Sequence, residues 1–183
     1  IIVDLGKTYL MDSFVIYDFE RQLGERDYVY TLSVSNDEID DLANQASANW
    51  YEVGSKPRGT TIYKMDYDLS RKQLVRYIKF DRLACPGVLS FSISEAEAYG
   101  MEIDDIQAVK DYVINEINTY ENDVTLNDEE ASAKAQVVSE VIDEINNAAT
   151  VEEAVNTLNA GLDEVDEVIV VAQARKAAKE DIQ

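Results

Sequence analysis

The chain has 183 residues, of which 46% are hydrophobic, so it suits one large domain or two small ones and excludes collagen-like and wholly disordered proteins. Its 37 acidic and 16 basic residues give a net charge of −21, which repels nucleic acid and anionic membranes. The sequence has no histidine, so the commonest general base and histidine-containing metal sites are excluded. No apolar stretch is long enough to cross a bilayer. We therefore expect neither a nucleic-acid partner nor membrane insertion.

The composition changes near residue 101. All aromatic residues except Tyr112 and Tyr120, both prolines, and every glycine except Gly161 lie in the first hundred residues, whereas most of the excess negative charge lies in the rest. Such a step marks a domain boundary. We therefore predict two domains, residues 1–101 and residues 102–183. Because the sequence starts inside a predicted strand and without Met, we expect it to be part of a longer protein.

The first domain has the pattern of short β-strands. Runs rich in Val, Ile, Tyr, Phe and Thr are separated by turn residues. From Tyr28 to Ser35, and again from Ser90 to Ser94, the residues alternate as they do in a strand with one buried face. No long helix separates the runs, so the pattern predicts an antiparallel sandwich or barrel. The predicted strands are residues 1–5, 12–19, 28–35, 49–53, 60–67, 74–82 and 89–99.

The second domain has the pattern of amphipathic helices. Its apolar residues recur every three or four positions in three separate stretches. Acidic runs fall in the first turns of these stretches or opposite their apolar positions, so we interpret them as solvated surface and not as metal or catalytic sites. The predicted helices cover about 104–122, 127–148 and 150–181.

The starts of the second and third helices carry their own signals. Asn127 with Glu130, and Thr150 with Glu153, have the spacing of a capping box, in which two side chains satisfy each other's backbone donors. Gly161 lies inside the third helical pattern without changing its phase. It leaves two alternatives open, one continuous helix weakened by about 1 kcal/mol or a helix broken in two.

Five segments of the first domain form an ordered set of landmarks: Val3 to Lys7, Phe14 to Tyr17, Tyr28 to Ser35 followed by Asn36, Asp37 and Trp50, Arg76 to Phe80, and Glu95 to Gly100. Taken in this order, they resemble the discoidin, or coagulation factor 5/8 type C, domain. The bacterial relatives of that domain include the family 32 carbohydrate-binding modules. The resemblance implies a jelly-roll-like, galactose-binding-like antiparallel β-sandwich with ligand-binding loops at one end. We therefore expect a multidomain β + α chain in which this sandwich precedes an all-α three-helix bundle.

The resemblance covers residues 1–100 and lacks the N-terminal part of the family. That part supplies the first strands and loops with ligand-contacting aromatic residues. A sandwich without an edge strand has unpaired strand backbone. We therefore expect the segment to lie elsewhere in the parent protein, or a partner or insertion to cover that edge.

The resemblance implies where a ligand would bind. In the loop after the second predicted strand it points to Arg21, Arg26 and Asp27, and in the loop before the last strand to Arg82. A guanidinium presents paired donors to vicinal sugar hydroxyls or to a carboxylate. The alternative is that the arginines are solvated loop residues. The second loop has no aromatic side chain, and this departure from the family weakens a galactose-specific assignment.

Four other residues have structural interpretations, and two of them, Glu95 and Trp50, have an alternative as well. Glu95 matches a carboxylate that helps to hold a structural calcium in some relatives, or it is an edge-strand carboxylate facing water. Trp50 is interpreted as a core residue at the start of a strand, the alternative being a platform for a sugar ring. Arg76 resembles the structural arginine of the family. Cys85 cannot form an internal disulfide and has no histidine to activate it, so we do not expect a reactive thiol.

The helical half loosely resembles the three-helix repeats between modules of large Gram-positive surface proteins, over residues 140–154. We therefore expect a non-enzymatic carbohydrate-binding module on a helical spacer, in a larger exported bacterial protein that is extracellular or at the cell surface, with a glycan as its partner. The alternative is a structural or adhesion module that binds no glycan and packs against another domain. An enzyme would need a carboxylate pair in a cleft, and the sequence singles out none.

Overall fold

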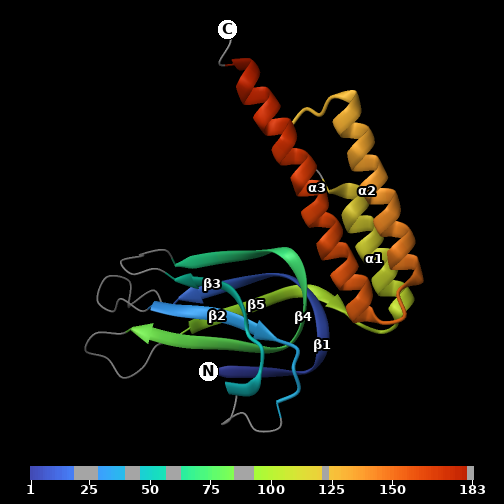
Figure 1. Cartoon of the computed structure of the whole chain (residues 1–183). Coiled ribbons are helices and arrows are strands. Elements are labelled where there is room, and N and C mark those ends of the chain that lie inside the picture. The colour runs from blue at the N-terminus through green and yellow to red at the C-terminus, as the bar shows by residue number, and fades with distance from the viewer. Residues whose placement is uncertain (19–28, 40–45, 57–62, 85–92, 121–123, 181–183) are drawn as a thin grey trace. The chain divides into compact units, whose positions relative to one another are not determined.

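The computed structural model describes residues 1–18, 29–39, 46–56, 63–84, 93–120 and 124–180. The chain divides into two compact units, Ile1–Glu102 and Ile103–Gln183, which are described separately here. In the described residues, the first unit is an antiparallel β structure and the second consists of helices (Figure 1). The predicted fold class, a β-sandwich followed by a three-helix region, is confirmed.

The β unit consists of one antiparallel sheet that folds over on itself. Its described strands lie in the order β3-β2-β4-β1-β5. The two long strands, β1 with 17 residues and β4 with 21, pair with each other along most of their length. Both strands bend, so that each contributes to two layers (Figure 1). The strands are β1 (Ile2–Asp18), β2 (Val29–Ser35), β3 (Tyr51–Lys56), β4 (Lys64–Ala84) and β5 (Ile93–Glu102).

The prediction of separate strands was wrong in two places. The described parts of the predicted strands 1–5 and 12–19 lie in the single strand β1, and those of 60–67 and 74–82 lie in the single strand β4. The β1–β4 register has irregularities at Asp4/Tyr9 and at Met11/Ser13, where extra residues turn the strands without ending the pairing. In the first of these, Gly6 has a φ of 81°, a conformation that side-chain-bearing residues rarely adopt.

The core lies between the two layers. Phe14 of β1 and Tyr67 of β4 come from one layer, and Leu32 of β2 and Phe80 of β4 come from the other; all are buried in one cluster. Burial of each large apolar side chain contributes roughly 1.5–3 kcal/mol. The remaining buried members are Met11, Ile16, Tyr30, Val34, Leu69, Val75 and Ile78.

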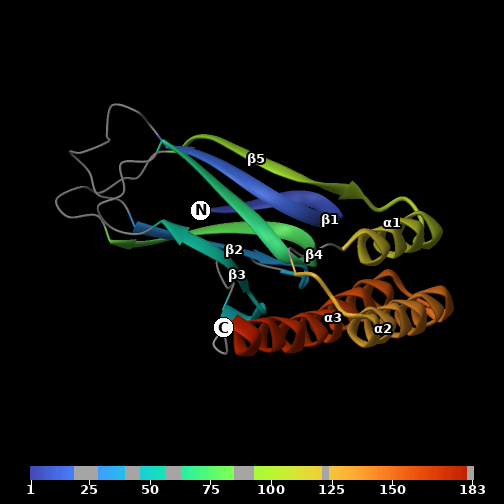
Figure 2. The same ribbon diagram turned by 90° about the horizontal axis from the view of Figure 1, so that it is seen from above.

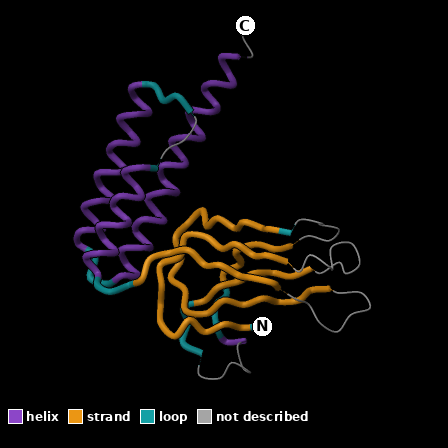
Figure 3. Tube along the Cα trace, turned by 180° about the vertical axis from the view of Figure 1, so that it is seen from behind, coloured by secondary structure: helices purple, strands orange, loops and turns teal. Residues whose placement is uncertain are grey.

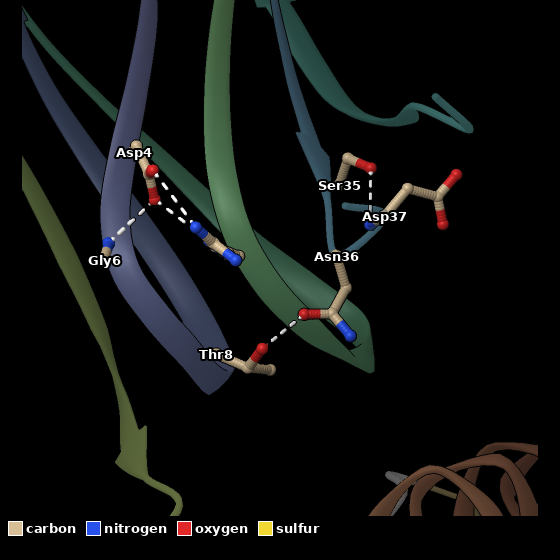
Figure 4. Close-up of polar contacts among 7 residues, drawn as sticks. Asp4, Gly6, Thr8, Ser35, Asn36 and Asp37 are labelled. Atoms are coloured by element: carbon tan, nitrogen blue, oxygen red, sulfur yellow. Dashed lines mark hydrogen bonds and ion pairs between the residues drawn. The ribbon is translucent and has the colours of Figure 1, made fainter. Parts of the chain in front are cut away.

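The first bend of β1 is held by Asp4. Its carboxylate accepts hydrogen bonds from the backbone N–H of Gly6 at 2.8 Å and from the Arg76 guanidinium at 3.2 and 3.4 Å (Figure 4). Nearby, the Thr8 hydroxyl donates to the Asn36 side chain at 2.6 Å. Arg76 therefore joins β4 to the bend of β1, in agreement with its interpretation as a structural arginine.

The helical unit contains three helices whose starts are capped. The Asn127–Glu130 capping box is present, with hydrogen bonds of 2.8 and 2.9 Å, and Thr150 and Glu153 make the equivalent reciprocal pair. Asp105 caps the first helix. None of the described helices is long and apolar enough to span a membrane. The helices are α1 (Ile106–Thr119), α2 (Asp128–Asn147) and α3 (Val151–Glu180), and Figure 2 shows α2 beside α3.

Gly161 lies where the three helices pack together. The third helix is continuous through it, which decides between the two alternatives that the sequence left open. A Cβ atom at this position would lie 2.5 Å from Val141 Cγ2 and 3.0 Å from Ile117 Cδ1. The glycine therefore allows close approach of α3 to both other helices. The buried residues of α3 are Ala154, Val155, Leu158, Leu162, Val165, Ile169 and Ala172.

One acidic residue departs from the solvated surface that the sequence predicts. Glu130 is 7% exposed, and its carboxylate pairs with the Arg175 guanidinium at 2.7 and 2.8 Å while it also caps α2. A buried carboxylate needs such partners because loss of hydration is costly. Glu130 therefore ties the start of α2 to the C-terminal part of α3.

Candidate functional site

The strand register brings three connecting segments to one end of the β-sandwich. At this end Tyr17 of β1 is opposite Lys64 of β4, and Val29 of β2 is opposite Ala84 of β4. Asp18 is opposite Ile93 of β5. The segments between β1 and β2, between β3 and β4, and between β4 and β5 all start and finish here (Figure 3). We call this the loop end.

The sequence-predicted ligand residues belong to segments attached at the loop end. Arg21, Arg26 and Asp27 lie outside the described residues. The backbone of Arg82 lies in β4 opposite Tyr30 of β2, and its side chain is outside the described part of the structure. The topology therefore attaches both predicted loops to the same end of the sandwich, and the ligand contacts of these four residues remain predictions.

A cluster of aromatic and charged side chains lies beside the loop end. Phe14 and Ile16 of β1 point into the core, so the alternate residues of β1 point to the outer face. Residues directly opposite across an antiparallel pair share a face, which places neighbours from β4 and β5 on that outer surface. We call this cluster the outer patch: Tyr17, Tyr63, Lys64, Asp66, Glu95, Glu97 and Tyr99.

The aromatic rings of the outer patch are accessible. The Tyr17 and Tyr63 ring centroids are 5.7 Å apart with an interplanar angle of 58°. Tyr63 is 43% exposed and Tyr99 is 50% exposed. The exposed Tyr63 ring beside the half-buried Tyr17 ring offers an apolar surface with polar edges.

Hydrogen bonds fix the charge states of the outer patch. The Tyr99 hydroxyl donates to the Glu97 carboxylate at 2.6 Å, and this bond raises the pKa of the Tyr99 phenol above its ordinary value. Lys64 Nζ lies 2.8 Å from Asp66 Oδ1, and that hydrogen bond raises the pKa of the Lys64 ammonium. The patch therefore presents the Lys64 ammonium as a donor beside carboxylate acceptors, while the hydrogen of the Tyr99 hydroxyl is bound by Glu97.

The outer patch has the chemistry to hold a polyhydroxylated molecule. Exposed rings can contact the C–H face of such a molecule, and the neighbouring carboxylates and ammonium can hydrogen-bond to its hydroxyls. Within the described ranges, no group of three or more His, Cys, Asp or Glu residues could hold a metal ion. Glu95 is exposed on β5 opposite Tyr17, and its calcium role remains a prediction.

Trp50 lies immediately before β3, but it is only half-buried. The interpretation as a core tryptophan was therefore wrong. The reason is that β3 is an outer strand of the sheet, so residues at its start are covered on one side only. The Lys79 ammonium lies 4.2 Å from the centroid of the Trp50 ring, a cation–π contact. Lys79 therefore occupies a ring face that a sugar would need.

Sequence reasoning missed the outer patch. Its members come from three strands, and which of them are neighbours depends on the pairing register. The sequence did contain one usable signal, the alternation in Glu95-Ala-Glu-Ala-Tyr99, which places every second residue on one face. The tilted contact between the Tyr63 and Tyr17 rings has no counterpart in the local sequence.

The sequence has no significant match among protein-family models or curated proteins. Solved structures do resemble it. The Clostridium perfringens chain CpGH89CBM32-6 is 16% identical, with 54% of this chain and 66% of that chain covered and a TM-score of 0.40. The CBM32 of AlyQ, in complex with 4,5-unsaturated mannuronic acid, is 18% identical, with 54% and 67% covered and a TM-score of 0.38.

A family 89 glycoside hydrolase from Clostridium perfringens, in complex with PUGNAc, is 15% identical with a TM-score of 0.41. The match covers 82% of this chain and 16% of the hydrolase. The chain thus spans about two thirds of the two module chains and a small part of the hydrolase. The sandwich assignment rests on the strand order, the register and the two-layer core described above.

Proposed function

We propose that the β unit is a non-catalytic carbohydrate-binding module and that the helical unit is a spacer, within a larger exported protein. The observation that carries this proposal is the outer patch, where exposed tyrosine rings lie among hydrogen-bond donors and acceptors beside the loop end. The solved carbohydrate-binding structures named above are compatible with it, and the chemistry of the patch supports it.

The ligand would bind across the outer patch and the loop end together. Tyr63 would contact a sugar ring face, while Glu97 and Lys64 would bind hydroxyls at its edge. Arg21 and Arg26 follow β1 in the sequence, and we propose that their guanidinium groups add paired donors. The carboxylates of the patch and the net charge of −21 favour neutral glycans over uronic acids or sulfated glycans.

The test is a calorimetric titration of the full chain against a panel of neutral and acidic glycans. We expect saturable binding of a neutral glycan that weakens by about tenfold in Tyr63→Ala, because a contact with an aromatic ring contributes about 0.5–1.5 kcal/mol beyond the area that it buries. Loss of a guanidinium contact in Arg21→Ala or Arg26→Ala would also weaken binding.

The matched control is Tyr51→Ala. Tyr51 is an exposed tyrosine, 41% accessible, at the start of β3 and outside the outer patch. We expect this variant to bind like the unchanged protein. Equal loss of affinity in Tyr51→Ala and Tyr63→Ala, or release of hydrolysed sugar by the unchanged protein, would contradict the proposal.

The second candidate function is a structural or adhesion module that packs against another polypeptide. One observation favours it, the solvent-exposed apolar side chains along the outer edge of β5 and the start of β1. A flat response to every glycan, from protein shown to be folded, would support this candidate over glycan binding.

A further inference from the structure

The outer face of β1 carries three rows of side chains that begin at the loop end. Alternate residues of β1 point to this face, and each is opposite one residue of β4 and one of β5. Because directly opposite residues share a face, every row runs across three strands. The rows are Lys64–Tyr17–Glu95 at the loop end, then Asp66–Val15–Glu97, and then Asp68–Ser13–Tyr99.

The aromatic side chains of the outer patch belong to different rows. Tyr63 directly precedes Lys64 and contacts the Tyr17 ring, so these two rings lie at the first row. Tyr99 belongs to the third row, four residues after Glu95 on β5. A strand rises about 3.3 Å per residue, so the Cα atoms of Glu95 and Tyr99 are about 13 Å apart. The aromatic side chains of the patch therefore extend over more than the width of one sugar ring.

Both aromatic positions are held in place by neighbours. The Tyr99 hydroxyl donates to the Glu97 carboxylate at 2.6 Å, which directs the Tyr99 ring from the third row toward the second. The Tyr63 ring is in contact with the Tyr17 ring, at a centroid distance of 5.7 Å. Side chains that are already ordered lose less conformational freedom when a ligand binds. The patch thus offers two preformed aromatic surfaces, one at each end.

The middle row between these surfaces is rich in hydrogen-bond acceptors. Asp66 and Glu97 lie on either side of Val15, which is buried beneath its neighbours. The Asp66 side chain is 55% exposed, so its carboxylate is accessible. Carboxylates accept strong hydrogen bonds from hydroxyl groups and repel other anions. The middle row therefore suits the hydroxyl groups of neutral sugar units that extend from one aromatic surface to the other.

We propose that the outer patch binds a chain of neutral sugar units through two aromatic subsites, and not a single sugar. This inference rests on the proposed glycan-binding function and names the class of ligand. One sugar unit contacts Tyr63 beside Tyr17 in the first subsite, and another contacts Tyr99 in the second. Hydroxyl groups of the chain donate to Asp66 and Glu97. Once one unit is bound, the second contact becomes intramolecular, which raises the affinity of the whole chain.

A single sugar unit held at the first subsite is the alternative ligand. In that case Tyr99 would have no contact with the ligand, and its hydrogen bond to Glu97 would only order the surface of β5. The two ligands differ in one measurable property, which is how the affinity depends on the number of linked sugar units.

The experiment is a calorimetric titration of the full chain with neutral oligosaccharides of increasing length. The probes are the cello-, manno-, xylo- and galacto-oligosaccharides, each from the monosaccharide to the hexasaccharide. We expect the affinity in at least one series to rise by about tenfold from the monosaccharide to the length that occupies both subsites. Beyond that length we expect the affinity to stay level.

Variants of Tyr99 assign the gain in affinity to the second subsite. Tyr99→Ala is expected to abolish the gain with length and to leave the affinity for the monosaccharide unchanged. Tyr99→Phe keeps the ring and is expected to retain most of the gain. The matched control is Tyr51→Ala, which removes an exposed tyrosine of β3 outside the outer patch and is expected to change the affinity at no length. Tyr63→Ala is expected to weaken binding at every length.

Two results would overturn this inference without contradicting the proposed function. One is equal affinity of the unchanged protein for the monosaccharide and for the longer members of every series that binds. The other is a gain with length that persists in Tyr99→Ala, or a loss in this variant that is equal at all lengths. Absence of binding by every oligosaccharide would overturn the proposed function and this inference with it.

Discussion

Among single residues, the Asp4 carboxylate joins the first bend of β1 to β4. The hydrogen bond from the Arg76 guanidinium is the largest cause that lowers the pKa of Asp4 below its ordinary value. The hydrogen bond from the Gly6 N–H lowers this pKa further. A carboxyl whose pKa is lowered by folding adds stability that is complete above its unfolded pKa and is lost as the pH falls through its folded pKa. We expect Arg76→Ala to raise the pKa of Asp4 and to move acid unfolding to higher pH.

The measurement is an NMR titration of the Asp4 side-chain carboxyl. Arg71→Ala serves as the control because Arg71 is another β4 arginine, and one of its hydrogen bonds goes to the Ser70 carbonyl oxygen. An Asp4 pKa that is unchanged in Arg76→Ala would contradict this account of the bend.

At the scale of elements, the packing of α3 against α1 and α2 depends on the absence of a side chain at Gly161. Alanine is favoured over glycine inside a helix by about 1 kcal/mol. Here the added methyl would collide with Val141 and Ile117, and overpacking of a core costs about 1–3 kcal/mol. We therefore expect Gly161→Ala to lower the free energy of unfolding of the helical unit, measured by denaturant titration followed by circular dichroism.

A second substitution separates the steric effect of the added methyl from the effect of the higher helix propensity of alanine. Val141→Ala removes the atoms nearest to the added methyl, so Gly161→Ala should be better tolerated in the Val141→Ala background than in the unchanged protein. A higher free energy of unfolding in Gly161→Ala, as helix propensity alone would give, would contradict the close approach of the three helices at Gly161.

The helices were predictable because their signals are local. The spacing of Asn127 and Glu130, and that of Thr150 and Glu153, lies within one turn, and the apolar periodicity lies within each helix. The pairing of Glu130 with Arg175 was not predictable, because it joins residues 45 positions apart. Local patterns specify a helix, and the partner of a buried charge depends on packing.

The strands were less predictable than the helices. The turn residues after Leu5 indicate the end of a strand, and the alternation alone does not show that β1 continues through a bend. Continuation depends on β4, which keeps pairing on both sides of the irregularity at Asp4/Tyr9. The outer patch could not be predicted from the local sequence either, because the pairing register places Tyr17 opposite Lys64 and Glu95.

At the scale of the whole molecule, the two units differ in the chemistry that they present. The helical unit carries most of the excess negative charge, whereas the β unit carries the aromatic residues. The β unit presents two chemically distinct surfaces, the outer patch with exposed tyrosines and the inner margin at β5 with exposed alanines. We propose that the outer patch binds a neutral glycan.

The most direct test of the central claim is NMR chemical-shift mapping of the isotope-labelled full chain, titrated with neutral glycans. The account predicts that a glycan shifts the resonances of Tyr63, Lys64 and Glu97, together with those of residues 19–28, and leaves Tyr51 and the three helices unchanged. Shifts confined to the helices or to Tyr51, or no shifts with any glycan at saturating concentration, would contradict a carbohydrate site at the loop end.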